Sequence, residues 1–232
     1  MAIRLHIGAG ASQMEGWINA DLYPAGTIDL VFDLEQPWPL ADGAVEAIYG
    51  SHVLEHLTGL RVFFDEAWRV LDDQGTMLLR TPFGAHRAAW WDVTHIRPWF
   101  AESFCSLQPG YDKAIGNPQH RAFQEKPWQI DLAQMRVAPV LARWLRWKLG
   151  RRLLVPRLQY FTDVVEELFV QLRALKSVRS VEAFQAAGRH PATVPVQYVI
   201  YAHELAGTSL AAGEPLMLSR LGMGEMLAGY RA

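Results

Sequence analysis

Short apolar runs that end in glycine or an acidic residue alternate with polar turns through the first 82 residues, and this pattern restricts the possible folds. The runs lie at residues 3–7, 17–20, 28–32, 45–49 and 76–81. Between the last two, apolar residues recur at helical spacing over residues 60–71, and residues 72–75 end that helix. Strands that alternate with a helical segment predict an α/β domain with a mostly parallel sheet.

The link between the second and third predicted strands is short. Only residues 22–27 separate them, whereas a crossover between parallel strands normally needs a dozen residues or more. Either this connection is abbreviated or one of the two strands is misassigned, and the sequence leaves both interpretations open.

Composition limits the class of protein. The 232 residues fit one domain, or one domain with a substantial insertion. A net charge of -2 and a pI of about 6.4 argue against a nucleic-acid-binding surface. The single cysteine, Cys105, excludes an internal disulfide or a multi-cysteine metal site. No apolar segment approaches the length of a membrane span, and residues 1–6 do not resemble a signal peptide, so we expect a cytoplasmic protein.

Polar residues and glycines cluster at the ends of the predicted strands, where parallel sheets bind their ligands. Asp21 could accept hydrogen bonds from ribose hydroxyls, and Asp33 could accept one from the amine of adenine. The full set is Gly8, Gly10, Asp21, Asp33, Ser51 and His52. The alternative is that the glycines only form a turn and the two aspartates are only capping residues.

Two phosphate-binding patterns are absent. The third glycine of the dinucleotide fingerprint is replaced by Gln13, and Asp21 comes much sooner than the acid of that fingerprint. The Gly-Lys-Ser/Thr ending of a P-loop is also missing. The remaining candidate is a nucleoside ligand that needs no phosphate cradle, and S-adenosylmethionine fits this description.

Residues 3–82 resemble the class I S-adenosylmethionine-dependent methyltransferases of the type 11 group. The matching stretches are residues 5–10, 16–21, 32–34, 37–40, 51–57 and 66–75. The resemblance implies a Rossmann-like, doubly wound and mostly parallel sheet, with a helical and loop insertion before the last strands. The implied cofactor-binding residues are Gly8, Ala9, Gly10, Asp21, Leu22, Asp33, Leu34, Ser51 and His52.

The stretch 52–56 also matches H-x-x-E-H, a zinc-protease pattern. On a helix, His52 and His56 would share one face, but catalytic zinc would need a third protein ligand. The type 11 group carries the same five residues without metal. We therefore expect no metal, with His52 at the cofactor pocket and Glu55 and His56 at a helix start; a zinc hydrolase is the weaker alternative.

Residues 83–104 supply the candidate catalytic groups. Asp92 and His95 lie three residues apart, so the carboxylate could orient the imidazole as a general base. The stretch 90–95 resembles an x-D-P-T-H segment of related methyltransferases, with Val93 in place of proline. The alternative is that Asp92 and His95 bond locally and only hold the loop.

The remainder divides into four expected parts. Residues 1–82 form the cofactor core, 83–195 an acceptor-side insertion, 196–205 a strand that returns to the sheet, and 206–232 a tail that could bind a protein partner. Within the insertion we expect a loop over residues 105–130 and a helix that opens at Thr162-Asp163, with Leu168, Leu172 and Leu175 on its apolar face.

Residues 132–162 carry seven basic residues and no acid, and six of the nine tryptophans lie between residues 90 and 147. Helical spacing within 136–152 allows contact with an anionic membrane, but packing on the parent domain is favoured. A third interpretation is that the basic residues bind an anionic acceptor. The leading hypothesis is a methyltransferase for a small-molecule or glycan acceptor, and the alternative is a non-catalytic module with the same fold.

Overall fold

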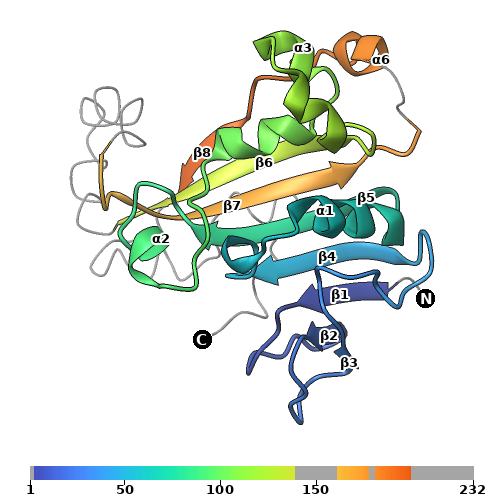
Figure 1. The fold of residues 1–232 in the computed structure, drawn as a ribbon, viewed down its shortest axis with the longest axis vertical. Helices are drawn as coiled ribbons and strands as arrows, with labels where there is room; N and C mark the ends of the chain where they lie inside the picture. Colours follow the sequence, from blue (N-terminus) through green and yellow to red (C-terminus); the bar gives the residue numbers. More distant parts are fainter. Residues whose placement is uncertain (1–2, 139–160, 178–180, 200–232) are drawn as a thin grey trace, which may run out of the picture.

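The computed structural model describes residues 3–138, 161–177 and 181–199. These residues build one eight-stranded mixed sheet with the order β3-β2-β1-β4-β5-β7-β6-β8 (Figure 1). The strands are β1 (Ile3–Ile7), β2 (Ile18–Asp21), β3 (Leu30–Val31), β4 (Val45–Ser51), β5 (Leu71–Pro82), β6 (Trp128–Val137), β7 (Val165–Ala174) and β8 (Val196–Val199). The helices are η1 (Leu54–His56), α1 (Leu60–Val70), α2 (Ala88–Trp91), η2 (Ala101–Leu107), α3 (Tyr111–Ile115), η3 (Pro118–Phe123) and α6 (Val181–Ala186).

The first five strands are parallel, which confirms the predicted α/β fold. The short link between β2 and β3 is an abbreviated crossover, because Ala20 pairs with Leu30 and Asp21 with Val31 in parallel register. β3 has two residues and β2 has four, so the chain must return by only about 7–13 Å. The link over residues 22–29 contains a turn closed by the Ile28 N–H and the Ala25 carbonyl, and it is long enough for this return without a helix.

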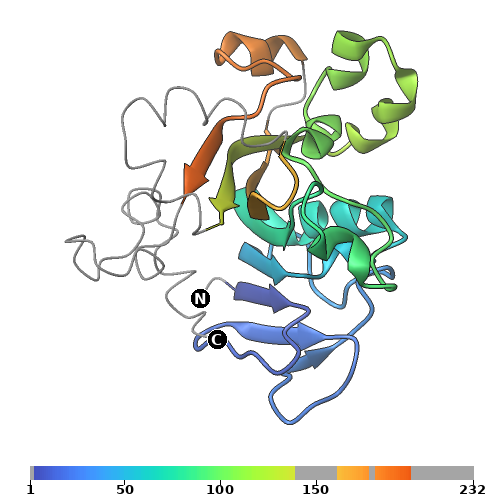
Figure 2. The same cartoon turned by 90° about the vertical axis from the view of Figure 1, so that its left-hand side faces the viewer.

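Helix α1 supplies the predicted apolar face, since Phe63, Phe64, Ala67 and Val70 are all buried. It connects β4 to β5, and α1 and α3 lie on the same side of the sheet (Figure 2). The sheet's own core residues, such as Leu5, Ile48 and Leu79, are almost fully buried. In the described ranges no helix has the length and apolar character needed to cross a membrane.

The helix predicted to open at Thr162-Asp163 is wrong. Val165–Ala174 is strand β7, which pairs antiparallel with β5 on one side and β6 on the other. Both faces of β7 are covered, so its residues are buried without alternation. Leucines four residues apart then fit a helix as well as a strand. Acidic residues near the start of the segment and basic residues near its end also fit a helix, and this added to the wrong prediction.

The insertion is also divided differently from the prediction. Residues 105–130, expected as loop, contain part of η2, all of α3 and η3, and the start of β6. The range 83–195 therefore holds two strands of the main sheet, and Val137, placed on a basic helix, ends β6. β8 confirms a strand from Val196, while 139–160 and the tail 206–232 lie outside the described residues.

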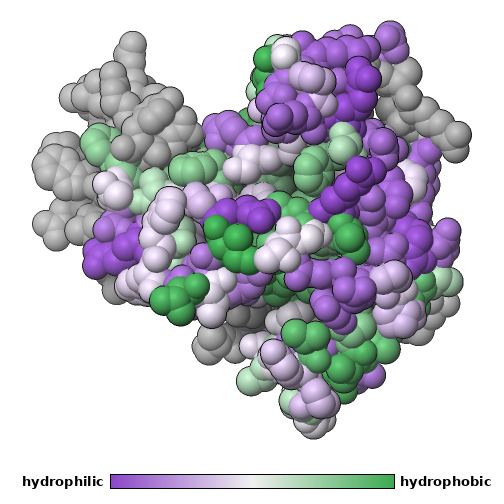
Figure 3. Space-filling view, viewed as in Figure 1, coloured by the Kyte–Doolittle hydropathy of each residue, from purple (hydrophilic) through white to green (hydrophobic). Residues whose placement is uncertain are grey.

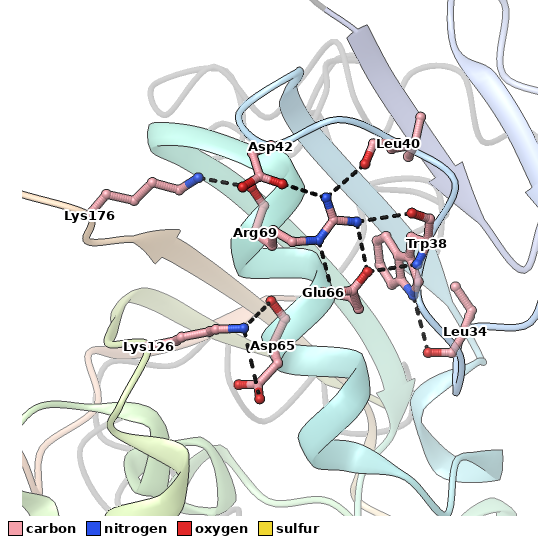
Figure 4. A network of polar contacts seen from close by, with 9 residues as sticks. All are labelled: Leu34, Trp38, Leu40, Asp42, Asp65, Glu66, Arg69, Lys126 and Lys176. Atoms are coloured by element: carbon pink, nitrogen blue, oxygen red, sulfur yellow. Dashed lines mark hydrogen bonds and ion pairs between the residues drawn. The ribbon is translucent and has the colours of Figure 1, made fainter.

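Arg69 of α1 ties this helix to the loop that follows β3 (Figure 4). Its guanidinium donates to the carbonyls of Trp38 at 3.0 Å and Leu40 at 2.8 Å, and it pairs with Glu66 and Asp42 at 2.7 Å each. Glu66 also accepts from the Trp38 backbone N–H at 2.7 Å. Arg69 lowers the pKa of the Glu66 carboxyl. The Glu-x-x-Arg of the matching stretch thus fixes the 34–42 loop on α1.

Replacing Arg69 with Met should lower the free energy of unfolding by about 2 kcal/mol, because two carbonyls and Glu66 lose their charged donor. Urea denaturation followed by circular dichroism measures the change. Arg61→Met is the matched control on the same helix. Within the described residues, half-exposed Arg61 pairs with partly exposed Asp65 and exposed Glu125, so this variant should cost less than about 1 kcal/mol. Equal losses in the two variants would contradict the role given to Arg69.

Candidate functional site

A cavity of about 340 Å³ opens at the carboxyl ends of β1 and β2, the loop after β3, and the segment after β4. Six of the predicted site residues line it, namely Gly8, Asp21, Leu22, Asp33, Leu34 and His52. Residues that were not predicted as cofactor-binding also line it, namely Ala20, Tyr23, Phe32, Glu35, Val53, His56 and Leu57. The predicted strand-end residues therefore meet in one place.

The two glycines after β1 adopt left-handed backbone conformations, with φ of 61° at Gly8 and 52° at Gly10. A Cβ on Gly8 would overlap the side chain of Val53 in the cavity wall. The N–H of Gly10 donates to Asp21 Oδ2 at 2.9 Å. Ala9 is buried and its N–H donates to the carbonyl of Ala20, so Ala9 and Gly10 shape the loop without lining the cavity.

The two aspartates keep oxygen lone pairs free for a ligand. Asp21 accepts from the N–H groups of Gly10 and Tyr23, one on each oxygen. Asp33 accepts from the N–H of Glu35 at 2.8 Å through Oδ1. A carboxylate offers about four acceptor sites, so both groups are held in place and still able to accept.

The walls of the cavity are largely apolar. Phe32, Leu34, Val53 and Leu57 form them, and Leu22 is exposed at the rim. Figure 3 shows hydrophobic side chains gathered around the β2–β3 edge, where the rim lies. Flat apolar walls with a few fixed polar groups are typical of small-molecule sites. Apolar wall residues carry no sequence pattern beyond their position next to the polar ones. Phe32, Val53 and Leu57 were therefore not predicted, whereas Leu22 and Leu34 were predicted from the family resemblance.

Ser51 and His52, at the end of β4, differ in their position relative to the cavity. Ser51 is buried and does not line the cavity. His52 has a φ of 53° and lies between two carboxylates, with Nδ1 3.1 Å from Glu55 and Nε2 3.2 Å from Glu167. Burial disfavours the charged imidazole, but these two bonds raise the pKa of His52 to about 9. His52 is therefore protonated at neutral pH, is held by the two carboxylates, and is a poor proton acceptor.

Glu167 joins three strand ends and was not predicted, because β7 was read as a helix. Oε1 accepts from Arg80 of β5 at 2.6 Å, and Oε2 accepts from Arg136 of β6 at 3.0 Å. Burial opposes ionisation, but the bonds to His52, Arg80 and Arg136 lower the pKa of Glu167 to about 2. The antiparallel pairing of β7 with β5 and β6 brings these groups together.

The H-x-x-E-H stretch does not form the helical pair of histidines that the weaker zinc-hydrolase alternative required. Only Leu54–His56 form η1, one turn of 3₁₀ helix; His52 and Val53 precede this turn, and the α-helix begins only at Leu60. The nitrogens of His52 face Glu55 and Glu167, whereas His56 lies against His95, with ring centroids 4.8 Å apart.

Asp92 and His95 lie near each other on the loop after α2. Their closest atoms, Asp92 Oδ2 and His95 Nε2, are 3.9 Å apart, which is longer than a hydrogen bond. Asp92 Oδ1 instead accepts from the N–H and hydroxyl of Thr94, at 2.8 and 2.7 Å, and these bonds lower the pKa of Asp92. Asp92 thus holds the loop, and the His95 ring is buried beside the cavity-lining His56.

Comparison with known proteins identifies the first part of the chain. Residues 8–79 match the family model described as "Methyltransferase domain". No curated protein matches significantly.

Several solved structures match at low identity. YcgJ from Bacillus subtilis is 14% identical, with 76% of this chain and 93% of that chain covered and a TM-score of 0.45. An S-adenosylmethionine-dependent methyltransferase from Mesorhizobium loti is 16% identical, with coverages of 74% and 90% and a TM-score of 0.41. A methyltransferase from Archaeoglobus fulgidus is 14% identical, with coverages of 74% and 86% and a TM-score of 0.46.

Replacing Glu167 with Gln should change the acid limb of the stability curve. The folded pKa of about 2 lies below the usual 4.5, so the stabilisation by this carboxylate is complete above pH 4.5 and is lost as pH falls through about 2. The native protein should lose about 3 kcal/mol from this group over that interval, and Glu167→Gln should lack this loss. Urea denaturation from pH 7 to pH 2 measures both curves.

Above pH 4.5 the Gln variant should be less stable by about 3 kcal/mol, because His52, Arg80 and Arg136 lose their shared anion. The control is Glu166→Gln, whose carboxylate is more exposed and, among the described residues, pairs with Arg136 alone, at 3.4 Å; it should cost less than about 1 kcal/mol at pH 7. Parallel curves for the native protein and Glu167→Gln would contradict the prediction.

Proposed function

The chain carries a class I S-adenosylmethionine-dependent methyltransferase domain of the type 11 group at residues 8–79, and from this premise we propose how the cavity holds the methyl donor. The Asp21 carboxylate accepts hydrogen bonds from the ribose hydroxyls, and Asp33 accepts one from the adenine amine. The adenine ring lies between the apolar walls formed by Phe32 and Leu57. The backbone of Gly8 borders the methionine end, next to His52.

One observation carries this assignment. Strand-end residues from four separate stretches of sequence line a single cavity, and the Gly10 N–H holds the Asp21 carboxylate at its edge. The cavity offers fixed acceptors for hydroxyls and an amine, apolar walls for a flat ring, and no cluster of basic side chains for a phosphate among its lining residues. These are the requirements of a nucleoside bearing a sulfonium.

Methyl transfer at this site joins an acceptor lone pair to the methyl carbon while the carbon–sulfur bond breaks and S-adenosylhomocysteine leaves. The protein must align the acceptor and, for a neutral oxygen or nitrogen, allow a proton to depart. We propose that the acceptor enters on the side of His52, His56 and the 83–104 loop. His95 is the candidate base there, and Asp92 positions it indirectly, through the loop that its carboxylate holds at Thr94.

The proposed acceptor is a small molecule or glycan that bears hydroxyl or amine groups. His52, which lines the cavity, belongs to a network of charged groups outside the lining, namely Arg80, Arg136, Glu55, Glu166 and Glu167. With His52 protonated this set has three positive and three negative members, so it suits a polar acceptor better than a hydrocarbon. The set carries no excess of positive charge that would select an anionic acceptor.

Isothermal titration with S-adenosylmethionine tests the donor site. Asp21→Asn should weaken binding at least tenfold, because an ionised acceptor becomes a neutral amide. Gly8→Ala should also weaken it at least tenfold, since the new Cβ overlaps Val53. Gly16→Ala is the matched control: Gly16 also has a positive φ, of 77°, but a Cβ there meets nothing within 4 Å, so affinity should stay within about threefold. Folded native protein that binds no donor would instead favour a non-catalytic module.

Replacing His95 with Ala should leave the donor affinity within about threefold and lower turnover at least a hundredfold for an oxygen or nitrogen acceptor. Formation of S-adenosylhomocysteine over a panel of hydroxyl- and amine-bearing acceptors measures turnover. His120→Ala provides a control, because His120 lies on η3 and contacts Tyr111, outside the cavity lining. Full turnover by the His95 variant would show that His95 is not required.

A further inference from the structure

Glu55, His56 and His95 converge beside the cavity although they come from two separate segments. Each offers one ligand atom, and these atoms all lie within 4.8 Å of one another. The N–H of Ile96 donates to the Glu55 carbonyl at 2.8 Å, which fixes the loop of His95 against η1. We propose that this Glu55–His56–His95 cluster binds a divalent first-row transition-metal ion.

Two atoms of the cluster lack partners within the described part of the chain. The Glu55 side chain is only 2% exposed and its Oε2 has no hydrogen-bond partner there, while Oε1 contacts His52. The His95 side chain is 8% exposed and its Nδ1 has no partner either. A buried polar atom without a partner costs free energy, and few occur in a folded protein. A shared cation would satisfy both atoms at once.

The contacts of the remaining ring nitrogens fit ligation. His56 Nδ1 lies 3.0 Å from the Thr94 hydroxyl and 3.3 Å from the Thr94 carbonyl. A proton on Nδ1 donated to that carbonyl leaves the Nε2 lone pair for a metal. His95 Nε2 faces Asp92 Oδ2 at 3.9 Å, which leaves Nδ1. Histidines that bind metals usually donate a hydrogen bond from their other nitrogen to an oxygen; His56 meets this pattern at Thr94, whereas the 3.9 Å between His95 and Asp92 is too long for such a bond.

The donor set indicates the class of metal. Two imidazoles and one carboxylate are typical ligands of zinc and of non-haem iron, whereas magnesium and calcium prefer oxygen ligands. Ligand atoms around tetrahedral zinc are separated by roughly 3.3–3.5 Å, so side-chain rotations that move these atoms by about 1 Å complete the geometry. Three protein ligands leave a position open for water or an acceptor oxygen.

The position of His56 gives the metal a role that rests on the proposed function. His56 lines the donor cavity, so a metal on its ring adjoins the space assigned to the acceptor. A hydroxyl bound to the metal becomes more acidic. In the metal-bound form His95 is a ligand and no longer the base, so the hydroxyl proton passes to water. The oxygen then attacks the methyl carbon, and S-adenosylhomocysteine leaves as the carbon–sulfur bond breaks. This also replaces the His52–His56 pair of the H-x-x-E-H pattern by a different set of three.

Equilibrium dialysis of the full-length, metal-free protein against Zn²⁺, without S-adenosylmethionine, tests the site directly. We expect about one equivalent of bound zinc, not displaced by Mg²⁺. His56→Ala and His95→Ala should each weaken zinc binding at least tenfold, and His120→Ala should keep it within about twofold. Far-UV circular dichroism on each variant verifies folding, and Glu55→Gln is a further variant that retains the buried side-chain volume.

The visible spectrum of the Co²⁺-loaded protein provides a second readout, since His56→Ala and His95→Ala should alter its ligand-field bands. Absence of stoichiometric zinc in the native protein would overturn the proposal, as would zinc retained by both variants. Loss of zinc in His52→Ala with retention in His95→Ala would restore the H-x-x-E-H pair instead. Donor titrations on the same samples separate a failed metal site from a failed donor site.

Discussion

The pairing of β1 with β2 on one side and β4 on the other is the constraint on which the site depends. Ile7 pairs with Ala20 and with Gly50, so the chain leaves the sheet at the same level three times. The turn at Gly8, the carboxylate of Asp21 and the reversal at His52 therefore meet at one edge. Sequence order separates these residues, and parallel hydrogen bonding brings them together.

The fourth part of the cavity depends on side chains instead of strand pairing. β3 has only two residues, so it cannot hold the following loop by itself. Arg69 and Glu66 hold the loop at Trp38 and Leu40, and Glu35 holds it at the N–H of Gly59 and the hydroxyl of Thr58. Asp33 and Leu34 lie just before these anchors. The short β2–β3 crossover is thus compensated by charged contacts to α1 and its N-terminus.

The sequence predicted the parts of the molecule whose signals are local. β1, β2 and the apolar face of α1 follow from short-range periodicity, and the strand-end glycines and aspartates follow from residue type and position. β7 could not be predicted, because burial on both faces removes the alternation that distinguishes a strand, and its leucines repeat every four residues. Glu167 was therefore not predicted either, since its partners His52, Arg80 and Arg136 come close to it only through the antiparallel pairing of β7 with β5 and β6.

The stretch His52 to His56 shows why spacing alone is a poor guide to a site. A helix would place its two histidines on one face, but the positive φ at His52 and the single 3₁₀ turn after it separate them. His52 turns toward Glu167 on β7 and His56 toward His95 on the loop after α2, with Glu55 buried between them. The chemistry of the stretch is thus decided by residues about 40 and 115 positions away, so the spacing of the five residues does not by itself determine which of them would bind a metal.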